Sequence, residues 1–574
     1  MAEPLSKLYF LFDRDHGPRD RLLPRWIFLR GLGLVYFSAF LALAFQILGM
    51  SGSGGILPAA PYLTALRQLG NQRFWLAPTV LWWGSSDHTL TLLVWVGLLA
   101  SVLVTLNLIP RPALIVCWVC FLSWVAVSQD FGQYQSDGML LEAGLLAILI
   151  APTGLRPRWG QHSLASRAAW FLLLWEWFRI YFESGVVKLA SGDPTWRNLT
   201  AMYEYYQNGP LPTWIGWYLQ HLPFAVHKFT AALTLVMELV LVFLAFLPRR
   251  WRIACFVVVT VWQAGVIATA NYAFLNYLVL ILGFLLLDDR ALLRFVPERW
   301  RTGLTSNTEA TLLHHPASPE ALRTSFDLSS RADRSAVERP AVEEAKAGDQ
   351  GAPIRSLNRG LRRHPRDLVR ALRIALTTVL LTAIAYATTL ELLDLFLPRN
   401  PLPSGPNTLL EPFRVANQYG LFANMTPHRY EIEFQGSDDG ANWTPYLFRF
   451  KPQDTHTRPG IYAPYQPRFD WNLWFASLTA WDQAPIVPRT ELRLLENSPE
   501  TLSLFRGNPF PNHPPKYIRA VLYQYWFSTP EQKRTEGLWW TRKYLGTYAP
   551  TLTRTPDGKF AAVAVPDLNG PPPE

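Results

Sequence analysis

The feature that most constrains this fold is a series of apolar windows long enough, or nearly long enough, to cross a membrane as helices. Crossing the hydrocarbon core takes about 20 mostly apolar residues in an α-helix. The windows are residues 27–48, 89–109, 113–128, 139–151, 167–189, 229–247, 252–270, 272–287 and 368–397. Half of the 574 residues are hydrophobic, which is high for a soluble enzyme. The pattern predicts a polytopic α-helical membrane protein with about 8 to 9 transmembrane helices.

Arginine residues occupy alternate connections between these windows. They are Arg14, Arg19, Arg21, Arg25, Arg111, Arg156, Arg158, Arg167, Arg249, Arg250 and Arg252. The opposite connections, residues 131–138 and 271–277, contain no Lys or Arg. Because Lys and Arg favour cytoplasmic loops, we expect a cytoplasmic N-terminus. The formal net charge of +10 is then explained by orientation in a lipid bilayer, and no nucleic-acid partner is expected.

Composition divides the chain into five parts. Residues 300–367 are rich in Ala, Arg, Glu, Ser and Pro and show no apolar period, which is typical of disorder. Farther on, RYEIEFQGS and PYLFRFKP flank the turn sequence DDGANW, a hairpin signal. The expected parts are a cytoplasmic leader (1–26), a transmembrane helical domain (27–290), a disordered cytoplasmic linker (291–367), a last transmembrane helix (368–397) and a non-cytoplasmic, β-rich, sandwich-like soluble domain (398–574).

Charged residues inside the apolar windows are the first candidates for function, because a charge at membrane depth costs a few kcal/mol and usually lies in a protein interior or a wet cavity. They are Glu142, Glu176, Arg179, Glu183 and Glu238. On a helix, Glu176, Arg179 and Glu183 share one face, so we expect Arg179 to bridge both carboxylates. Two interpretations stay open, namely an ion network that holds helices together and a polar interior that opens outward.

A polar and aromatic stretch leaves the membrane after residue 188. Lys188 lies off the face of the other charges, near the outer interface, where its ammonium group could extend to the lipid headgroups. The residues that follow are candidates for a client-binding surface, although aromatic residues also serve as interface anchors. They are Asp193, Trp196, Arg197, Asn198, Tyr203 and Glu204. In the outer domain, Arg468, Asp470 and Arg519 are candidates for protein contacts because core packing does not call for them.

Catalytic and metal-binding motifs are absent from the sequence. It contains no HExxH, Walker or GxSxG motif, so we expect no metal site and no cofactor. Asp137 is expected to cap the helix that carries Glu142. The cysteines Cys117, Cys120 and Cys255 all lie in apolar windows. The CxxC pair formed by the first two is typical of small buried residues, although thiol exchange with a quinone is an alternative.

Several long motifs resemble the lipase maturation factor family, whose members are endoplasmic-reticulum membrane chaperones for certain dimeric lipases. The motifs are FGQYQSDGMLLEAG, WEWFRIYFESGVVKLASGDPTWRNLTAMYEYYQNGPLPT, ANQYGLFANMT, EIEFQGSDDG, QPRFDWNLWFA and NPFPNHPPKYIRA. They cover most of the chain outside residues 300–367. The resemblance implies a non-enzymatic, multi-pass membrane protein that assists exported clients such as lipases. Its outer domain would face the periplasm or exterior in a bacterium, or the endoplasmic-reticulum lumen in a eukaryote.

A shorter stretch, ESGVVKLASGDPTW, resembles a segment of the vitamin K-dependent gamma-carboxylase and of other proteins with the horizontally transferred transmembrane domain. In that enzyme a lysine in a similar setting is the catalytic base, and Lys188 occupies the matching position. A lysine near a membrane interior is suited to such a role, because burial favours its neutral form. The resemblance implies an alternative function, a membrane-embedded enzyme that uses Lys188 as a base.

Overall fold

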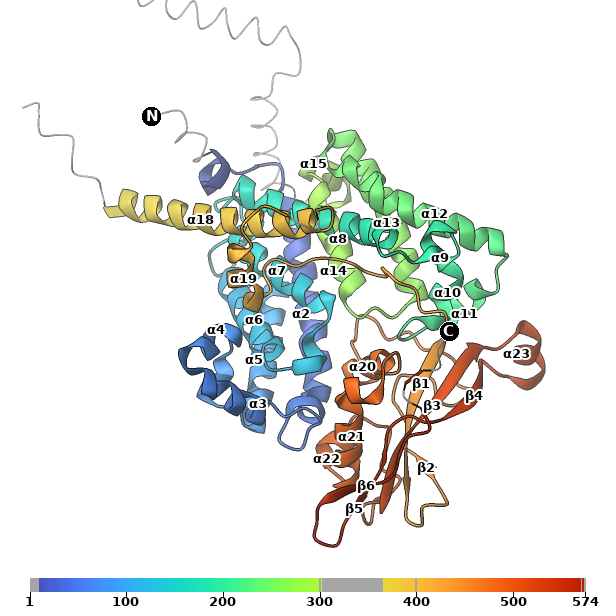
Figure 1. The fold of residues 1–574 in the computed structure, drawn as a ribbon. Coiled ribbons are helices and arrows are strands. Elements are labelled where there is room, and N and C mark those ends of the chain that lie inside the picture. The colour runs from blue at the N-terminus through green and yellow to red at the C-terminus, as the bar shows by residue number, and fades with distance from the viewer. Residues whose placement is uncertain (1–9, 299–300, 302–364, 398–399, 569, 572–574) are drawn as a thin grey trace, which may run out of the picture.

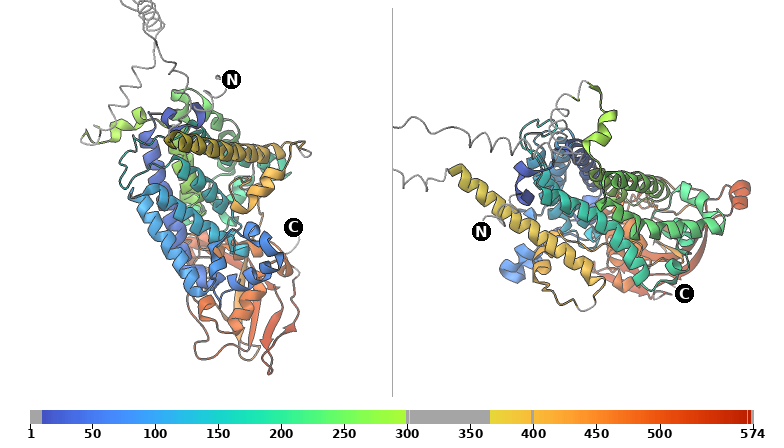
Figure 2. Two further views of the ribbon diagram at one scale, coloured as in Figure 1. Left: turned by 90° about the vertical axis from the view of Figure 1, so that its left-hand side faces the viewer. Right: turned by 90° about the horizontal axis from the view of Figure 1, so that it is seen from above.

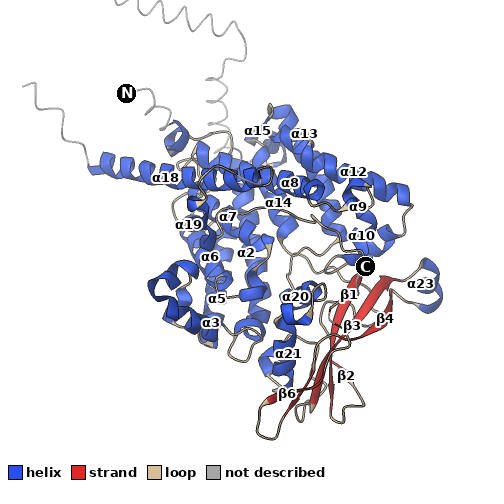
Figure 3. Cartoon of the chain, viewed as in Figure 1, coloured by secondary structure: helices blue, strands red, loops and turns tan. Residues whose placement is uncertain are grey.

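A helical half and a sheet-containing C-terminal half make up the fold (Figures 1 and 3). The computed structural model describes residues 10–298, 301, 365–397, 400–568 and 570–571. Every apolar window of the sequence lies on a helix. These helices are α2 (Leu22–Ser51), α5 (Asp87–Thr105), α6 (Pro110–Val125), α7 (Gln135–Ile150), α8 (Arg167–Ala190), α12 (Phe224–Leu239, continued by η5, Leu241–Phe246), α13 (Arg249–Thr269), α14 (Leu275–Gly283, continued by η6, Phe284–Leu286) and α18 (Pro365–Asp394).

Five helices among the described residues are long and apolar enough to cross a membrane: Leu22–Ser51, Asp87–Thr105, Phe224–Phe246, Arg249–Thr269 and Val369–Asp394. Two more apolar helices, Pro110–Val125 and Leu275–Leu286, are shorter. Helix α8 has 24 residues but carries charged side chains in its apolar stretch. The prediction of a polytopic helical membrane protein is confirmed, and fewer helices qualify as spans than the sequence windows suggest because several windows are short or charged.

Local signals set the ends of several helices. Ser86 accepts a hydrogen bond of 3.3 Å from the Thr89 amide at the start of α5, and Ser166 does the same for Ala169 at the start of α8. Helix α6 begins with Pro110, a residue suited to the first helical turn because it has no amide hydrogen to leave unpaired.

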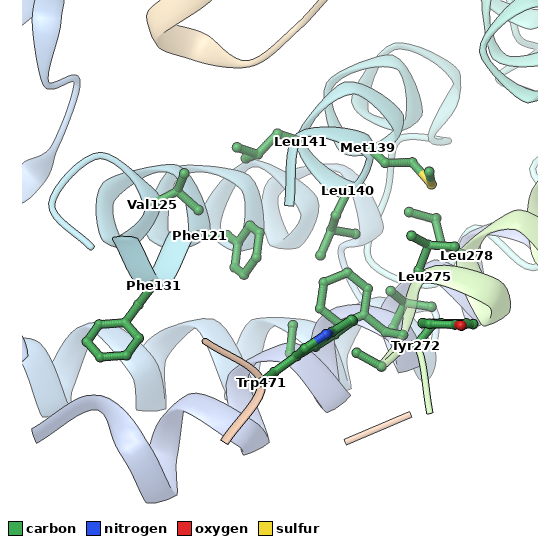
Figure 4. Packing of buried hydrophobic residues seen from close by; sticks show 14 of the residues in the cluster. Phe121, Val125, Phe131, Met139, Leu140, Leu141, Tyr272, Leu275, Leu278 and Trp471 are labelled. Carbon is green, nitrogen blue, oxygen red and sulfur yellow. The ribbon is translucent and has the colours of Figure 1, made fainter. Parts of the chain in front are cut away.

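The core of the helical half continues into the C-terminal half. Leu140, Tyr272, Leu275 and Leu278 lie in one cluster with Trp471, which belongs to the C-terminal half (Figure 4). The ring of Trp471 is 6.4 Å from the ring of Tyr272, centroid to centroid. The two halves therefore share buried apolar surface, which favours their association.

The arginine-containing connections gather at one end of the helical half, near the start of α2. There Arg21 donates to the carbonyl of Leu286 at 3.4 Å, and Arg249 forms a 2.6 Å ion pair with Asp288. The uncharged connection at residues 271–277 contacts the C-terminal half, where Asn271 donates to the Gly460 carbonyl at 2.9 Å. The two sets of loops thus lie at different ends of the bundle, as their charges indicate. The expected leader is partly helical, because α2 already begins at Leu22, and residues 1–9 lie outside the described residues.

The C-terminal half is built on one antiparallel sheet. Its strands are β1 (Arg429–Ser437), β2 (Thr444–Pro445), β3 (Tyr517–Phe527), β4 (Trp540–Thr547), β5 (Thr551–Arg554) and β6 (Phe560–Ala564). The order is β2-β1-β3-β5-β6, and β4 also pairs with β3. The predicted hairpin is present, with Gly436 opposite Thr444. The expected β-rich domain is confirmed, and helices α20 (Arg468–Ala476) and α21 (Ile486–Leu495) take the place of a second sheet in packing against the first.

Helix α18 runs along the outside of the helical half, steeply inclined to α2 (Figures 1 and 2). Just after its end the chain contacts α8, where the rings of Phe182 and Phe396 are 6.1 Å apart. Most of the expected linker, residues 302–364, lies outside the described residues. After α18 the chain passes through α19 (Gly405–Leu410) and returns to the helical half before entering β1.

Candidate functional site

The returning chain, residues 415–426, lies between the helical half and the sheet, and we call it the return segment. It contains no helix and no strand. Backbone amide and carbonyl groups in such a segment need hydrogen-bond partners from elsewhere when they are buried. Polar side chains of the helical half supply many of these partners.

Arg179 of α8 is at the centre of the first contact. It donates hydrogen bonds to Glu142 of α7 and lies 3.5 Å from Glu183. It also donates to the backbone carbonyl of Asn417 at 2.7 Å. Tyr419 completes the cluster, because its hydroxyl donates to Glu142 at 2.9 Å and its amide donates to Glu183 at 2.7 Å. The charged side chains of α7 and α8 thus bind the return segment through hydrogen bonds.

Arg179 was expected to bridge Glu176 and Glu183. The contact with Glu183 forms, but the contact with Glu176 does not. Among the described residues, the hydrogen bonds and ion pairs of Arg179 go to Glu142, Glu183 and the Asn417 carbonyl, and none goes to Glu176. Glu142 of the neighbouring helix takes its place. Spacing along α8 places the three residues on one face, but the packing of α7 against that face decides which carboxylate the guanidinium group contacts.

Lys188 lies inside the protein and does not reach the headgroup region. Its side chain is 2% exposed, and its ammonium group is 2.8 Å and 2.9 Å from the two carboxylate oxygens of Glu238. It also donates to the carbonyl of Leu421 in the return segment at 2.9 Å. An ammonium group has three hydrogens to donate, and these acceptors satisfy them.

The loop after α8 holds the next part of the return segment. Asp193 caps the short helix α9 (Pro194–Arg197) through the Thr195 amide at 2.8 Å. Its other oxygen accepts from the Met425 amide at 2.6 Å. Trp196 is 1% exposed and donates to the Phe422 carbonyl at 2.9 Å. These two client-binding candidates therefore bind the chain's own C-terminal half.

The remaining candidates of this loop lie apart from the return segment. Arg197 is exposed and donates to the Leu189 carbonyl at 3.1 Å, and Asn198 is exposed. Tyr203 is 47% exposed. Glu204 of α10 (Ala201–Asn208) accepts from Asn208 at 2.9 Å, and partial burial raises the pKa of its carboxyl.

A second anchor joins the halves through Arg468 of α20. Its guanidinium group forms bonds of 2.7 Å and 2.8 Å with the two oxygens of Asp137 and lies 4.4 Å above the ring of Trp124. Both charged side chains are almost fully buried. Asp137 does not cap α7 as expected, because the residue at the N-cap position of that helix is Tyr134. Asp137 is instead the partner of Arg468.

Asp470 and Arg519 stabilise the C-terminal half internally. Asp470 accepts from the amides of Phe450 and Lys451, both at 3.1 Å, and burial raises the pKa of its carboxyl to about 6. Arg519 donates to Gln435 at 2.8 Å and is partly exposed. Neither residue contacts the helical half through these bonds.

Gln46 and Arg429 also connect the helical half with the C-terminal half, and neither was a candidate from the sequence. Gln46 of α2 donates to the Gln466 carbonyl at 2.8 Å and accepts from the Arg468 amide at 2.8 Å. Arg429 of β1 donates to the Pro210 carbonyl at 3.0 Å. Gln46 is a polar residue inside the first apolar window, and that isolated polarity is the signal that could have found it.

A cavity of about 680 Å³ borders these contacts. Its walls come from α8, α12, α13, α14 and the return segment, and Lys188 and Glu238 are among the lining residues. No group of three or more His, Cys, Asp or Glu residues suited to a metal ion occurs in the part of the chain that the structure describes. The arrangement provides buried ion pairs, a backbone-binding surface and an apolar chamber.

Comparison with known proteins covers both halves. The lipase maturation factor transmembrane domain matches residues 23–294, and the lipase maturation factor C-terminal domain matches residues 415–550. The second match begins at the first residue of the return segment. No solved structure matches the chain.

Full-length relatives are similar over nearly the whole chain. Lipase maturation factor 2 of Gallus gallus is 32% identical over 95% of this chain and 84% of its own length. Lipase maturation factor 1 of Homo sapiens is 31% identical over 92% of this chain and 88% of its own length. The chain therefore belongs to the lipase maturation factor family.

Proposed function

We propose that this protein is a membrane-bound, chaperone-like maturation factor that assists the folding or assembly of exported lipases. The names of its relatives point to lipase clients. The anchored state of Lys188, with its ammonium group held by Glu238 and the Leu421 carbonyl, favours a structural role for the intramembrane charges. The observation that carries the proposal is an open sheet edge on the C-terminal half.

Strands β4 and β6 both have an unpaired edge among the described residues, and β6 is the one with an exposed apolar surface at the end of the sheet. Strand β6 stands at one end of the sheet, and within the described part of the chain its strand partner is β5 alone. Phe560, Val563 and Val565, on and just after this strand, are 37%, 53% and 85% exposed. Strand β2 at the other end has two residues and ends in Pro445, which cannot donate to a further strand. An exposed apolar edge invites pairing with another chain, and an incompletely folded client has strands to offer.

We also propose that the N-terminus is cytoplasmic and that the C-terminal half lies on the outer side. Support comes from the arginine-containing loops, which gather near the start of α2, whereas the far end of α2 packs against the C-terminal half, with Gly49 close to Glu500. When the protein is expressed in a bacterium, a cysteine in place of Asp557 should react with a membrane-impermeant maleimide in intact cells. A cysteine in place of Arg158 should react only after permeabilisation, and the opposite result would reverse the topology.

The client proposal is tested with full-length protein in cells that lack their own lipase maturation factor and secrete a lipase. Replacing Val563 and Val565 together by Asp should lower both secreted lipase activity per mole of lipase and client co-purification several-fold. Leu447→Asp is the matched control, because Leu447 is also exposed on the C-terminal half. Unchanged activity and recovery in the double variant would count against β6 as the client site.

Deleting residues 398–574 is a poorer test of the same idea. The deletion removes Tyr419 and Arg468, and so leaves Glu142 and Asp137 buried without these partners. Removing one partner of a buried pair is strongly destabilising. Loss of activity in that truncation would therefore report a damaged helical half as readily as a missing client site.

A second candidate function is base catalysis by Lys188, as in the gamma-carboxylase. The cavity that reaches Lys188 and Glu238 favours it. For catalysis the amine would have to leave its bonds to Glu238 and Leu421. Simultaneous replacement of Lys188 and Glu238 by apolar residues separates this candidate from the maturation factor, because a catalytic base cannot be restored by removing its partner.

A further inference from the structure

One part of the cavity rim is formed by exposed apolar residues of α13. Val261 of α13 lines it and is 69% exposed. Gly265, one helical turn farther on, also lines it, and a Cβ atom added to Gly265 would meet no atom within 4 Å. The neighbouring Val257 and Val258 are 52% and 46% exposed. Because α13 has the length and composition of a membrane span, exposed apolar residues on it are suited to contact with acyl chains.

A different part of the rim is polar. Gln133 and Gln135, just before and at the start of α7, line the same cavity and are exposed. Asn424 of the return segment is also exposed and lines it. The cavity therefore connects an apolar rim on one element with an amide-bearing rim on others.

The walls between these rims are mainly apolar. Leu233 of α12, Trp262 and Val266 of α13 and Leu275 of α14 line the chamber. Its volume, about 680 Å³, is in the range of cavities that bind small ligands. Apolar walls gain little from water, and a molecule that matches them is stabilised by the hydrophobic effect and by dispersion.

We infer that this cavity binds the acyl chain of a bilayer lipid. The chain enters past Val261 and Gly265 and packs between α12 and α13, and the oxygen-bearing end of the lipid lies toward Gln133 and Gln135, whose amides can donate to ester or carboxyl oxygens. The surrounding bilayer supplies such molecules directly at the apolar rim. Occupancy by lipid does not depend on the client proposal, because β6 plays no part in it.

Photocrosslinking in membranes tests the inference. The full-length protein is exposed to phosphatidylcholine with a diazirine in one acyl chain and, in a parallel sample, to diazirine-labelled palmitic acid. Labelled residues are then located by mass spectrometry. Labelling of the inner faces of α12 and α13 by either probe is expected, and the better probe tells whether an intact phospholipid or a free fatty acid is the source. Labelling confined to outward-facing residues with both probes would overturn the inference.

Two substitutions on α13 test the apolar rim, one that fills the cavity entrance and one that serves as its control. Gly265→Phe places a ring in the open space beside the cavity, whereas Ala264→Phe adds the same ring at an exposed neighbouring position that does not line it. Gly265→Phe should reduce labelling inside the cavity at least fivefold, and Ala264→Phe should leave it near the wild-type level. Equal labelling in both variants would overturn the inference.

A second filling variant guards against misfolding of the first. Leu233→Phe enlarges a lining residue on α12, and Val236→Phe enlarges an exposed residue of the same helix that does not line the cavity. Labelling is compared only between variants whose apparent melting temperatures in detergent agree with that of the wild type. Loss of inner labelling in Leu233→Phe alone supports the site, and retention in both members of this pair contradicts it.

Discussion

The hydroxyl group of Tyr419 donates a 2.9 Å hydrogen bond to the buried carboxylate of Glu142, although 277 residues separate the two in the chain. Glu142 belongs to a helix of the membrane half, and Tyr419 belongs to the return segment. The bond belongs to a larger set in which Arg179, Lys188 and Asp193 also bind backbone groups of that segment. Charged groups in the membrane half thereby hold the C-terminal half in place.

Tyr419→Phe removes one hydrogen bond and leaves the ring in place. The free energy of unfolding should fall by about 1–3 kcal/mol, because Glu142 stays buried with one partner fewer. Thermal unfolding in detergent measures the change. Gln418→Ala, at an exposed neighbouring position, is the control and should change the melting temperature little. Equal shifts in both variants would argue against a specific role for the hydroxyl group.

Arg468→Ala should destabilise the protein by about 3–5 kcal/mol, because Asp137 is then a buried charge without its cation. The double variant Arg468→Ala/Asp137→Ala should be less destabilised than the sum of the two single variants. A double-mutant cycle on melting temperatures measures the coupling. Strictly additive effects would mean that this pair does not join the halves energetically.

Substitutions of Lys188 and Glu238 distinguish a structural role of Lys188 from a role as catalytic base. Lys188→Met alone leaves Glu238 buried without its cation and should lower both folded yield and lipase maturation. Adding Glu238→Leu replaces the pair by apolar side chains, which are often tolerated in place of a buried ion pair. The double variant should recover more than half of the maturation activity, measured as secreted lipase activity. A catalytic base would not be recovered in this way.

Glu491 of α21 predicts a pH dependence of stability. Its carboxyl group is fully buried, and burial raises its pKa well above the ordinary value of 4.5. The folded state therefore holds a proton that the unfolded state releases above about pH 4.5. Stability from this group is complete at lower pH and decreases as the pH rises toward the folded-state pKa.

Glu491→Leu removes that titration and should raise the apparent melting temperature more at pH 8 than at pH 5. The exposed Glu496 of the same region provides the control, since Glu496→Gln should give a small shift at both pH values. Melting curves of the full-length protein at the two pH values measure the difference. A gain from Glu491→Leu that is the same at both would contradict the assignment.

Much of the helical half was predictable because its signals are local. The windows around α2, α5 and α13 are long apolar runs, and the lipid environment forces such runs to satisfy their own backbone groups as helices. Arg21 and Arg249 marked the loops that meet at one end of the bundle. In the C-terminal half, the DDGANW turn marked the β1–β2 hairpin for the same reason.

The roles of the charged residues were less predictable. Spacing paired Arg179 with Glu176, but the partner from outside its own helix is Glu142. Position suggested that Lys188 reaches the membrane surface, whereas Glu238 holds it inside. The client-binding candidates Asp193 and Trp196 contact the return segment, a partner that the sequence did not suggest. In each case the deciding partner lies on another element, which composition and periodicity do not identify.

The sequence by itself determined that the chain crosses a membrane several times, that its positive loops alternate with neutral ones, and that its motifs resemble the lipase maturation factor family. These properties depend on local hydropathy, charge and residue order. Only the tertiary structure decided that residues 415–426 lie on the buried charges of the helical half and that a largely apolar cavity borders them. Buried charges need partners at hydrogen-bond distance, and chain folding brings those partners from more than 200 residues away.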